Sequence, residues 1–123
     1  MKILITGIAG FIGFSIAKDL IKNKKNLVYG IDNFDNYYSK NYKKFRINFL
    51  KKKKNFKFHK LDITNNKSLS DFFSKNDFDV VMHFAAQAGV RYSIKHPRKY
   101  LNANINDFYK KIKKLNKNNI KRL

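Results

Sequence analysis

Three glycines near the start of the chain have a spacing that suits phosphate binding. Gly7, Gly10 and Gly13 stand three residues apart in TGIAGFIG, although the 123 residues include only five glycines. Glycine weakens the start of a helix, so three together indicate a backbone that side chains would obstruct. A glycine turn between a strand and a helix lets backbone amides and the positive end of the helix dipole face a pyrophosphate. We expect Gly7 to make the turn, Gly10 to admit the phosphates and Gly13 to let the helix lie close to the sheet.

An aspartate follows at the distance that a dinucleotide site needs. The second apolar run, NLVYGID, ends in Asp32, nineteen residues beyond Gly13. A carboxylate at this place can accept hydrogen bonds from the hydroxyl groups of an adenosine ribose, and its charge repels a 2′-phosphate. The glycines and Asp32 together predict a site for NAD in preference to NADP. The structural alternative is a tight turn with a solvent-exposed aspartate at a strand end.

Hydrophobic periodicity predicts strands and helices that alternate around these residues. Apolar or alternating runs predict strands over residues 2–6, 26–32, 56–62 and 79–85. Helical spacing predicts helices over residues 11–23, 39–52, 68–75 and from residue 97 onward. The last residues, IKRL, indicate the start of a fifth strand. We therefore expect residues 1–123 to form one α/β domain, a Rossmann-like doubly wound parallel sheet in the order 3-2-1-4 with a stub of strand 5, truncated there.

The composition limits the partners and the chemistry. The chain carries 28 Lys+Arg against 8 Asp+Glu, a formal charge of +20, which by electrostatics alone favours polyanions. The lysines are spread along the chain and do not alternate with aromatic residues on one platform. We therefore interpret the charge as compositional drift of the surface toward lysine and expect no specific nucleic-acid partner. The absence of cysteine excludes disulfides and thiolate chemistry. No apolar run suits a signal peptide or a membrane span, so we expect a cytoplasmic protein with no membrane partner.

Four segments resemble the extended short-chain dehydrogenase/reductase family. They are TGIAGFIG, IDNFDNYY (31–38), LDIT (61–64) and HFAAQAGVRYS (83–93). Within that family the chain is most similar to the NAD-dependent epimerases and dehydratases of nucleotide sugars, and above all to UDP-glucuronate 4-epimerases. The glycine motif is shared by many folds, whereas the AAQAGVRYS stretch is far more specific.

The resemblance implies which residues bind NAD. They are Gly7, Gly10, Phe11, Ile12, Gly13, Asp32, Asn33, Asp62, Ile63, Phe84, Ala85, Ala86, Gln87 and Asn104. Asp32 and Asn33 would hold the adenosine ribose. Asp62 and Ile63 would flank the adenine. Residues 84–87 would pass beneath the cofactor at the end of the fourth strand, where ligands of parallel sheets lie.

The resemblance also implies a nucleotide-sugar substrate. Val90, Arg91 and Ser93 would border the sugar. The planar fork of Arg91 can bind a carboxylate or a phosphate in bidentate fashion, although a solvated cation is the alternative in so basic a chain. In the complete enzyme we expect a UDP-sugar substrate and a homodimer.

The family's catalytic residues are not expected in this chain. In 4-epimerases a tyrosine, with a lysine four residues on, removes the 4-hydroxyl proton while hydride passes from C4 to NAD. The family places that pair after the fifth strand, where this chain stops, so we expect no epimerase activity from it alone. Tyr109 and Lys113 repeat the spacing, but they stand in the helix before that strand, and we interpret them as a solvated helix face.

The same residues are compatible with two other functions, and the histidines do not suit a metal site. The chain also fits a fragment of a dTDP-glucose-type dehydratase or of a UDP-glucuronate decarboxylase. A binding module that acts through its basic surface, without catalysis, is the alternative from another class. His59, His83 and His96 lack the spacing of metal ligands, and His83 is expected inside the fourth strand.

Overall fold

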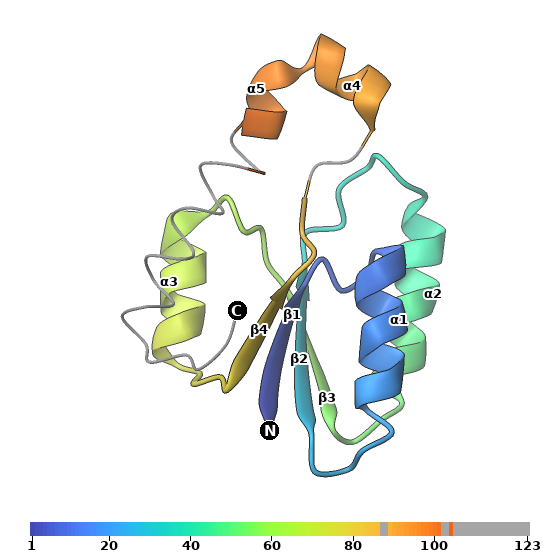
Figure 1. The fold of residues 1–123 in the computed structure, drawn as a ribbon, viewed down its shortest axis with the longest axis vertical. Coiled ribbons are helices and arrows are strands. Elements are labelled where there is room, and N and C mark those ends of the chain that lie inside the picture. The colour runs from blue at the N-terminus through green and yellow to red at the C-terminus, as the bar shows by residue number, and fades with distance from the viewer. Residues whose placement is uncertain (87–88, 102–103, 105–123) are drawn as a thin grey trace.

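The computed structural model describes residues 1–86, 89–101 and 104, and these form a parallel sheet with helices on both faces (Figure 1). The strands are β1 (Lys2–Thr6), β2 (Leu27–Asp32), β3 (Phe56–Lys60) and β4 (Val80–His83). The helices are α1 (Phe11–Leu20), α2 (Lys40–Lys51), α3 (Asn66–Ser74), α4 (Val90–Lys95) and α5 (Pro97–Tyr100). The strand order is β3-β2-β1-β4, which confirms the Rossmann-like sheet expected from the sequence.

β1 is the centre of the sheet because it pairs on both sides. Ile5 stands opposite Gly30 of β2 and opposite Met82 of β4, and both pairings are parallel. Ile3, Leu4 and Ile5 are completely buried, as a strand covered on both faces must be. All strands run the same way, so their carboxyl ends meet at one edge, where the glycine turn also begins.

The alternation of side chains in β1 divides the core into two layers. Ile3 and Ile5 point toward α1 and α2, where they pack in a cluster with Ile8, Ala9, Ala17, Ile21, Val28, Ile47, Leu50 and Phe56. Leu4 points to the other face, where its cluster holds Tyr29, Ile31, Ile63, Leu69, Phe72, Phe73, Phe78 and Val81. Figure 1 shows α1 and α2 on one side of the sheet and α3 on the other.

Several element boundaries differ from those predicted. The first helix ends at Leu20, before Asn23, and the fourth strand covers Val80–His83 instead of residues 79–85. α3 begins earlier than predicted because the side chain of Asn65 caps it by accepting a hydrogen bond from Ser68 N at 3.1 Å. The sequence analysis did not predict α4. The expected fifth strand and most of the long last helix lie outside the described residues.

Candidate dinucleotide site

Gly7 turns the chain out of β1, and both its conformation and its neighbours require glycine. Its φ is +68°, in the left-handed region. A Cβ atom at Gly7 would lie 2.7 Å from Ala85 N and 2.7 Å from the carbonyl carbon of Phe84. Gly7 N donates to the carbonyl oxygen of Ile31 at 2.9 Å. The turn is therefore held between the ends of β2 and β4, and the prediction that Gly7 makes the turn is confirmed.

Gly13 brings α1 close, but its contact is with the turn. A Cβ atom at Gly13 would lie 2.5 Å from Gly7 O and 3.1 Å from the Cα atom of Ile8. The prediction of close packing holds, and the surface in contact is the glycine turn itself, not the face of the sheet. The reason is that α1 begins only four residues after Gly7, so its first turn lies on the residues that lead into it.

The amino end of α1 presents backbone donors for which the described residues provide no acceptor. Gly10 is the N-cap residue, and no side chain caps the helix there. The first N–H groups of any helix have no acceptor within the helix. In α1 these belong to Phe11, Ile12 and Gly13, and the side chains of Phe11 and Ile12 are exposed. This end of α1 can donate hydrogen bonds to an anion, and the helix dipole adds a favourable charge.

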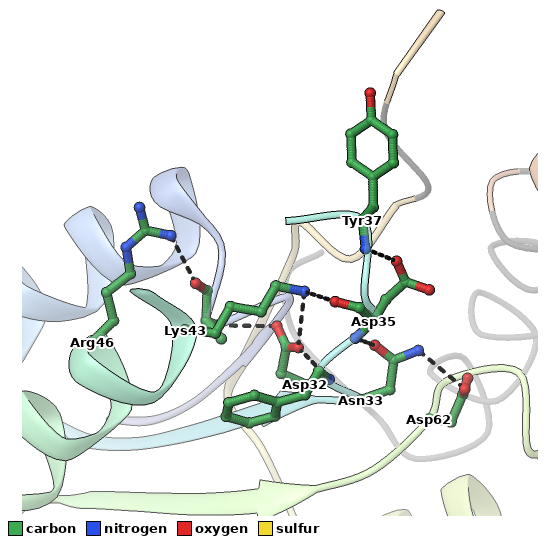
Figure 2. A network of polar contacts seen from close by, with 9 residues as sticks. Asp32, Asn33, Asp35, Tyr37, Lys43, Arg46 and Asp62 are labelled. Atoms are coloured by element: carbon green, nitrogen blue, oxygen red, sulfur yellow. Dashed lines mark hydrogen bonds and ion pairs between the residues drawn. The ribbon is translucent and has the colours of Figure 1, made fainter. Parts of the chain in front are cut away.

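Asp32 is a buried carboxylate that joins two loops (Figure 2). It ends β2 and is only 8% exposed. Its Oδ2 accepts from Ala9 N of the glycine turn at 3.1 Å, and its Oδ1 accepts from Phe34 N at 2.8 Å. The alternative of a solvent-exposed aspartate at a strand end is therefore wrong. Asp32 fixes the glycine turn relative to the loop that follows β2.

Two basic residues of α2 that were not predicted from the sequence reach into this site. Lys43 is 7% exposed. Its Nζ donates to Asp35 O at 3.0 Å and lies 3.9 Å from Asp32 Oδ1. Arg46 Nη1 donates to Ala9 O at 2.9 Å. Figure 2 shows both side chains extending from α2 toward the loops at the carboxyl edge.

A signal in the sequence could have revealed Lys43. It shares a helix face with Ile47 and Leu50, four and seven residues on, and both are buried against the sheet. A lysine in the apolar stripe of a helix needs a buried polar partner, which a solvated lysine does not. The abundance of lysine in this chain hid that signal.

The fold brings Asn33 and Asp62 together, a contact that was not predicted from the sequence. Asn33 Nδ2 donates to Asp62 Oδ2 at 3.0 Å, while Thr64 N donates to Asp62 Oδ1 at 2.8 Å. The neighbouring Ile63 is buried in the core on the α3 face. The ends of β2 and β3 thus carry polar side chains side by side.

The end of β4 lies against the glycine turn through Thr6, a residue the sequence analysis did not select. Phe84 N donates to Thr6 O and Ala85 N donates to Thr6 Oγ1, each at 3.1 Å. Thr6 Oγ1 also forms a hydrogen bond of 2.5 Å with His83 Nδ1. His83 is half-buried in β4. Phe84 and Ala85 are half-buried beside Gly7, whereas Ala86 is exposed.

The segment after β4 meets the loop after β2. Gly89 has a φ of +100°, and Tyr37 lies directly against it, in the place a side chain would need. Ser93, half-buried in α4, donates its N–H to Gly89 O at 3.0 Å. The expected sugar-bordering residues Val90 and Arg91 open α4.

The other residues predicted for the site lie beyond α5 or outside the described residues. Asn104 is exposed beyond α5. Gln87, Tyr109 and Lys113 lie outside the described residues. Within residues 1–86, 89–101 and 104, no three His, Cys, Asp or Glu side chains are grouped to hold a metal ion. In the same part of the chain, no helix has the length and apolar character that crossing a membrane requires.

Comparison with known proteins identifies relatives for this geometry. A model of the GDP-mannose 4,6 dehydratase family matches residues 4–119. Protein CapI of Staphylococcus aureus is 48% identical over 108 residues, 88% of this chain and 32% of that protein. The UDP-glucuronate 4-epimerase of Thermodesulfobacterium geofontis is 44% identical over 102 residues, 83% of this chain and 31% of the enzyme.

Solved structures agree with these relatives. UDP-glucuronic acid 4-epimerase from Bacillus cereus, in complex with UDP-glucuronic acid and NAD, matches with a TM-score of 0.86 at 36% identity. The match covers 99% of this chain and 38% of the enzyme. The chain thus spans about a third of the length of the relatives it matches. Because the family model covers nearly all of its residues, the chain belongs to the GDP-mannose 4,6 dehydratase family, among the epimerases and dehydratases that it resembles in sequence.

Proposed function

We propose that residues 1–123 form the NAD-binding portion of a UDP-glucuronate 4-epimerase. The observation that carries this proposal is the buried Asp32 carboxylate bound to the glycine turn at the carboxyl edge of the sheet. Ligands of open parallel sheets bind outside that edge, where the strand order reverses. The Bacillus cereus enzyme, solved with NAD and UDP-glucuronic acid, supports the proposal because its fold matches nearly the whole chain.

The residues at this edge fit a dinucleotide. The N–H groups at the amino end of α1 can donate to the pyrophosphate. Gly10 has no side chain, so it leaves room for the phosphates to approach these groups. Each oxygen of Asp32 accepts one backbone N–H and keeps lone-pair capacity for a ribose hydroxyl. Asn33 and Asp62 offer polar groups next to it. When bound, NAD supplies the hydride chemistry, and these residues bind and orient it.

Calorimetry of the chain with NAD and with NADP tests the cofactor proposal. We expect NAD to bind at least about tenfold more tightly, which corresponds to about 1.4 kcal/mol, because the Asp32 carboxylate repels a 2′-phosphate. Asp32→Asn should weaken NAD binding and narrow the difference between the two cofactors. Equal or tighter binding of NADP would overturn the proposal.

The sugar chemistry is proposed for the complete enzyme. Val90, Arg91 and Ser93 of α4 are the residues we place beside the sugar of a UDP-sugar substrate. The isolated chain should not turn over UDP-glucuronate, since the tyrosine and lysine that take the 4-hydroxyl proton in the family are expected after the fifth strand. We further propose that the complete enzyme is a cytoplasmic homodimer, which light scattering of a full-length protein would test.

A chimera tests the reaction. Residues 1–123 replace the matching segment of the Bacillus cereus epimerase, and conversion of UDP-glucuronic acid to its C4 epimer is followed by chromatography. We expect activity with NAD from this chimera. A dehydratase is the second candidate, because the matching family model carries that name. Activity only when the segment is joined to the remainder of a GDP-mannose 4,6-dehydratase would favour that candidate instead.

A further inference from the structure

A large cleft lies at the opposite edge of the sheet from the dinucleotide site. Its volume is about 770 Å³, and it is lined by the carboxyl ends of α1 and α2 and by the residues that lead into β2 and β3. In Figure 1 this is the lower edge of the molecule, where α1 and α2 end. Because all strands are parallel, this amino edge is separated from the glycine turn by the length of β2.

The cleft concentrates positive charge that is scattered in the sequence. Lys18, Lys22, Lys24 and Lys25 line it from the α1 side, and 52–54, all lysine, line it from the α2 side. None of the described residues that line it is acidic. Asp19 forms an ion pair of 2.7 Å with Lys22, and each of the two helix ends adds about half a negative charge. Most of the lysine charge is therefore uncompensated within this part of the structure.

Between its lysines the cleft has an apolar part of its lining, and two exposed aromatic residues outside the cleft share a helix face with its Phe49. Ile21 is buried in this apolar part, and Phe49 of α2 lines the cleft while 37% exposed. Phe49 is held edge-on against Phe14 of α1, with ring centroids 5.8 Å apart. Tyr42 and Phe45, seven and four residues before Phe49 on the same helix, are 70% and 69% exposed. Residues at these spacings share one face of α2.

We propose that this cleft binds single-stranded nucleic acid, with phosphates at the lysines and bases stacked on Phe49 and its aromatic neighbours. Stacking on aromatic rings within a basic groove is how proteins bind single strands without reading sequence. From the sequence no specific nucleic-acid partner is expected, because the lysines are spread along the chain and do not alternate with aromatic residues on one platform. The fold brings them together from two helices and two loops.

The shape and the charge distribution favour a strand over other anions. The lysines are exposed and distributed around a wide cleft, whereas a site for one phosphate needs donors that converge on a point. Proteins that bind an anionic membrane insert an apolar face into it, whereas this surface is concave. An extended chain of phosphates with planar bases matches both the lysines and the apolar part of the lining.

Fluorescence anisotropy with a labelled single-stranded RNA of about twelve nucleotides tests the proposal on the full chain. We expect binding that weakens steeply as salt rises from about 50 to 300 mM. The triple variant Lys24→Gln, Lys25→Gln, Lys53→Gln should lower the slope of log K against log salt by about 2, since each phosphate contact on a single strand contributes about 0.7. Phe49→Leu, which keeps an apolar side chain, should weaken binding by about fivefold or more.

A matched control separates the cleft from general charge. Lys67→Gln, Lys75→Gln, Lys95→Gln removes three exposed lysines that do not line the cleft, and it should leave most of the affinity intact. Circular dichroism melts confirm that each variant folds, and saturating NAD should not compete because its proposed site lies at the other edge. The proposal would be overturned if the two triple variants lost equal affinity for RNA or if Phe49→Leu kept the affinity unchanged. Binding to phosphatidylglycerol vesicles without binding to RNA would also overturn it.

Discussion

Asp32 and Lys43 are oppositely charged side chains that the fold buries close together. The carboxylate is held by two backbone N–H groups and the ammonium by a backbone carbonyl, with 3.9 Å between Lys43 Nζ and Asp32 Oδ1. A buried ion pair adds little net stability over apolar residues, but the loss of one partner leaves an uncompensated charge. The pair therefore matters for the geometry of the loops that it joins.

Lys43→Met is expected to destabilise the chain by about 3 kcal/mol, because it leaves the Asp32 carboxylate buried without its cation. Urea denaturation measures this change. Lys44→Met, at the exposed neighbouring position, should change the free energy of unfolding by less than about 0.5 kcal/mol. Similar losses in the two variants would show that Lys43 is not buried as described.

His59 gives the chain a pH-dependent stability. Its pKa is lowered from 6.5, first by partial burial and second by the charge of Lys57. The ring stacks on Tyr29, with centroids 5.9 Å apart. Since the unfolded chain binds the proton more tightly, protonation favours unfolding, and this contribution to stability is lost as pH falls through 6.5.

The matched variant for this effect is His59→Gln. We expect its melting temperature to fall less than that of the parent chain as the pH is lowered from neutrality to below 6.5. Thermal melts across a pH series, followed by circular dichroism, measure the difference. Parallel curves for the two proteins would contradict the assignment to His59.

At the scale of elements, β1, the glycine turn and α1 act as one unit. The turn is held by β2 through Gly7 N and Asp32, by β4 through the contact of Gly7 with Ala85, and by α2 through Arg46. Three other elements, β2, β4 and α2, thus determine where the amino end of α1 points. An anion site built on that end depends on all of these contacts, so changes remote from it should also weaken it.

Gly13→Ala tests the contact between α1 and the turn. A Cβ atom there would lie 2.5 Å from Gly7 O, so backbone must shift, and we expect a loss of about 2–3 kcal/mol despite the higher helix propensity of alanine. A Cβ atom at Gly10 would lie 3.1 Å from Gly7 O, so Gly10→Ala should lower the free energy of unfolding by less. Urea denaturation gives both values, and a larger loss at Gly10 would contradict the packing described.

At the scale of the whole molecule, charge is the dominant property. A formal charge of +20 on 123 residues repels itself, which opposes aggregation and also weakens the compact state. The fold does not distribute this charge evenly, because seven lysines line one cleft. Salt should therefore act on both stability and binding.

We expect the melting temperature to rise with sodium chloride, as the screening length falls from about 14 Å near 50 mM to about 4 Å near 0.5 M. Dilute samples keep self-association from contributing, and sucrose of matched viscosity serves as the uncharged control. A melting temperature that is constant or falls with salt would show that self-repulsion does not limit stability.

The sequence by itself determined the order of the strands and helices from β1 to β4, the parallel sheet and the position of the glycine turn. These depend on local signals: apolar runs such as KILIT, helical periodicity after Gly10, and glycines where a side chain cannot fit. The family resemblance added which residues to examine, and Asn33 and Asp62 do lie together. Their roles toward NAD stay predictions.

Only the tertiary structure decided which charges are buried and which are gathered. Lys43 looks like any other lysine in the sequence, and its burial depends on the carboxylate of another element, Asp32. The lysines of the cleft come from two separate segments, 18–25 and 52–54, whose proximity follows from the pairing of β2 with β3. Electrostatic interactions depend on distance in space, and distance along the chain does not reveal it.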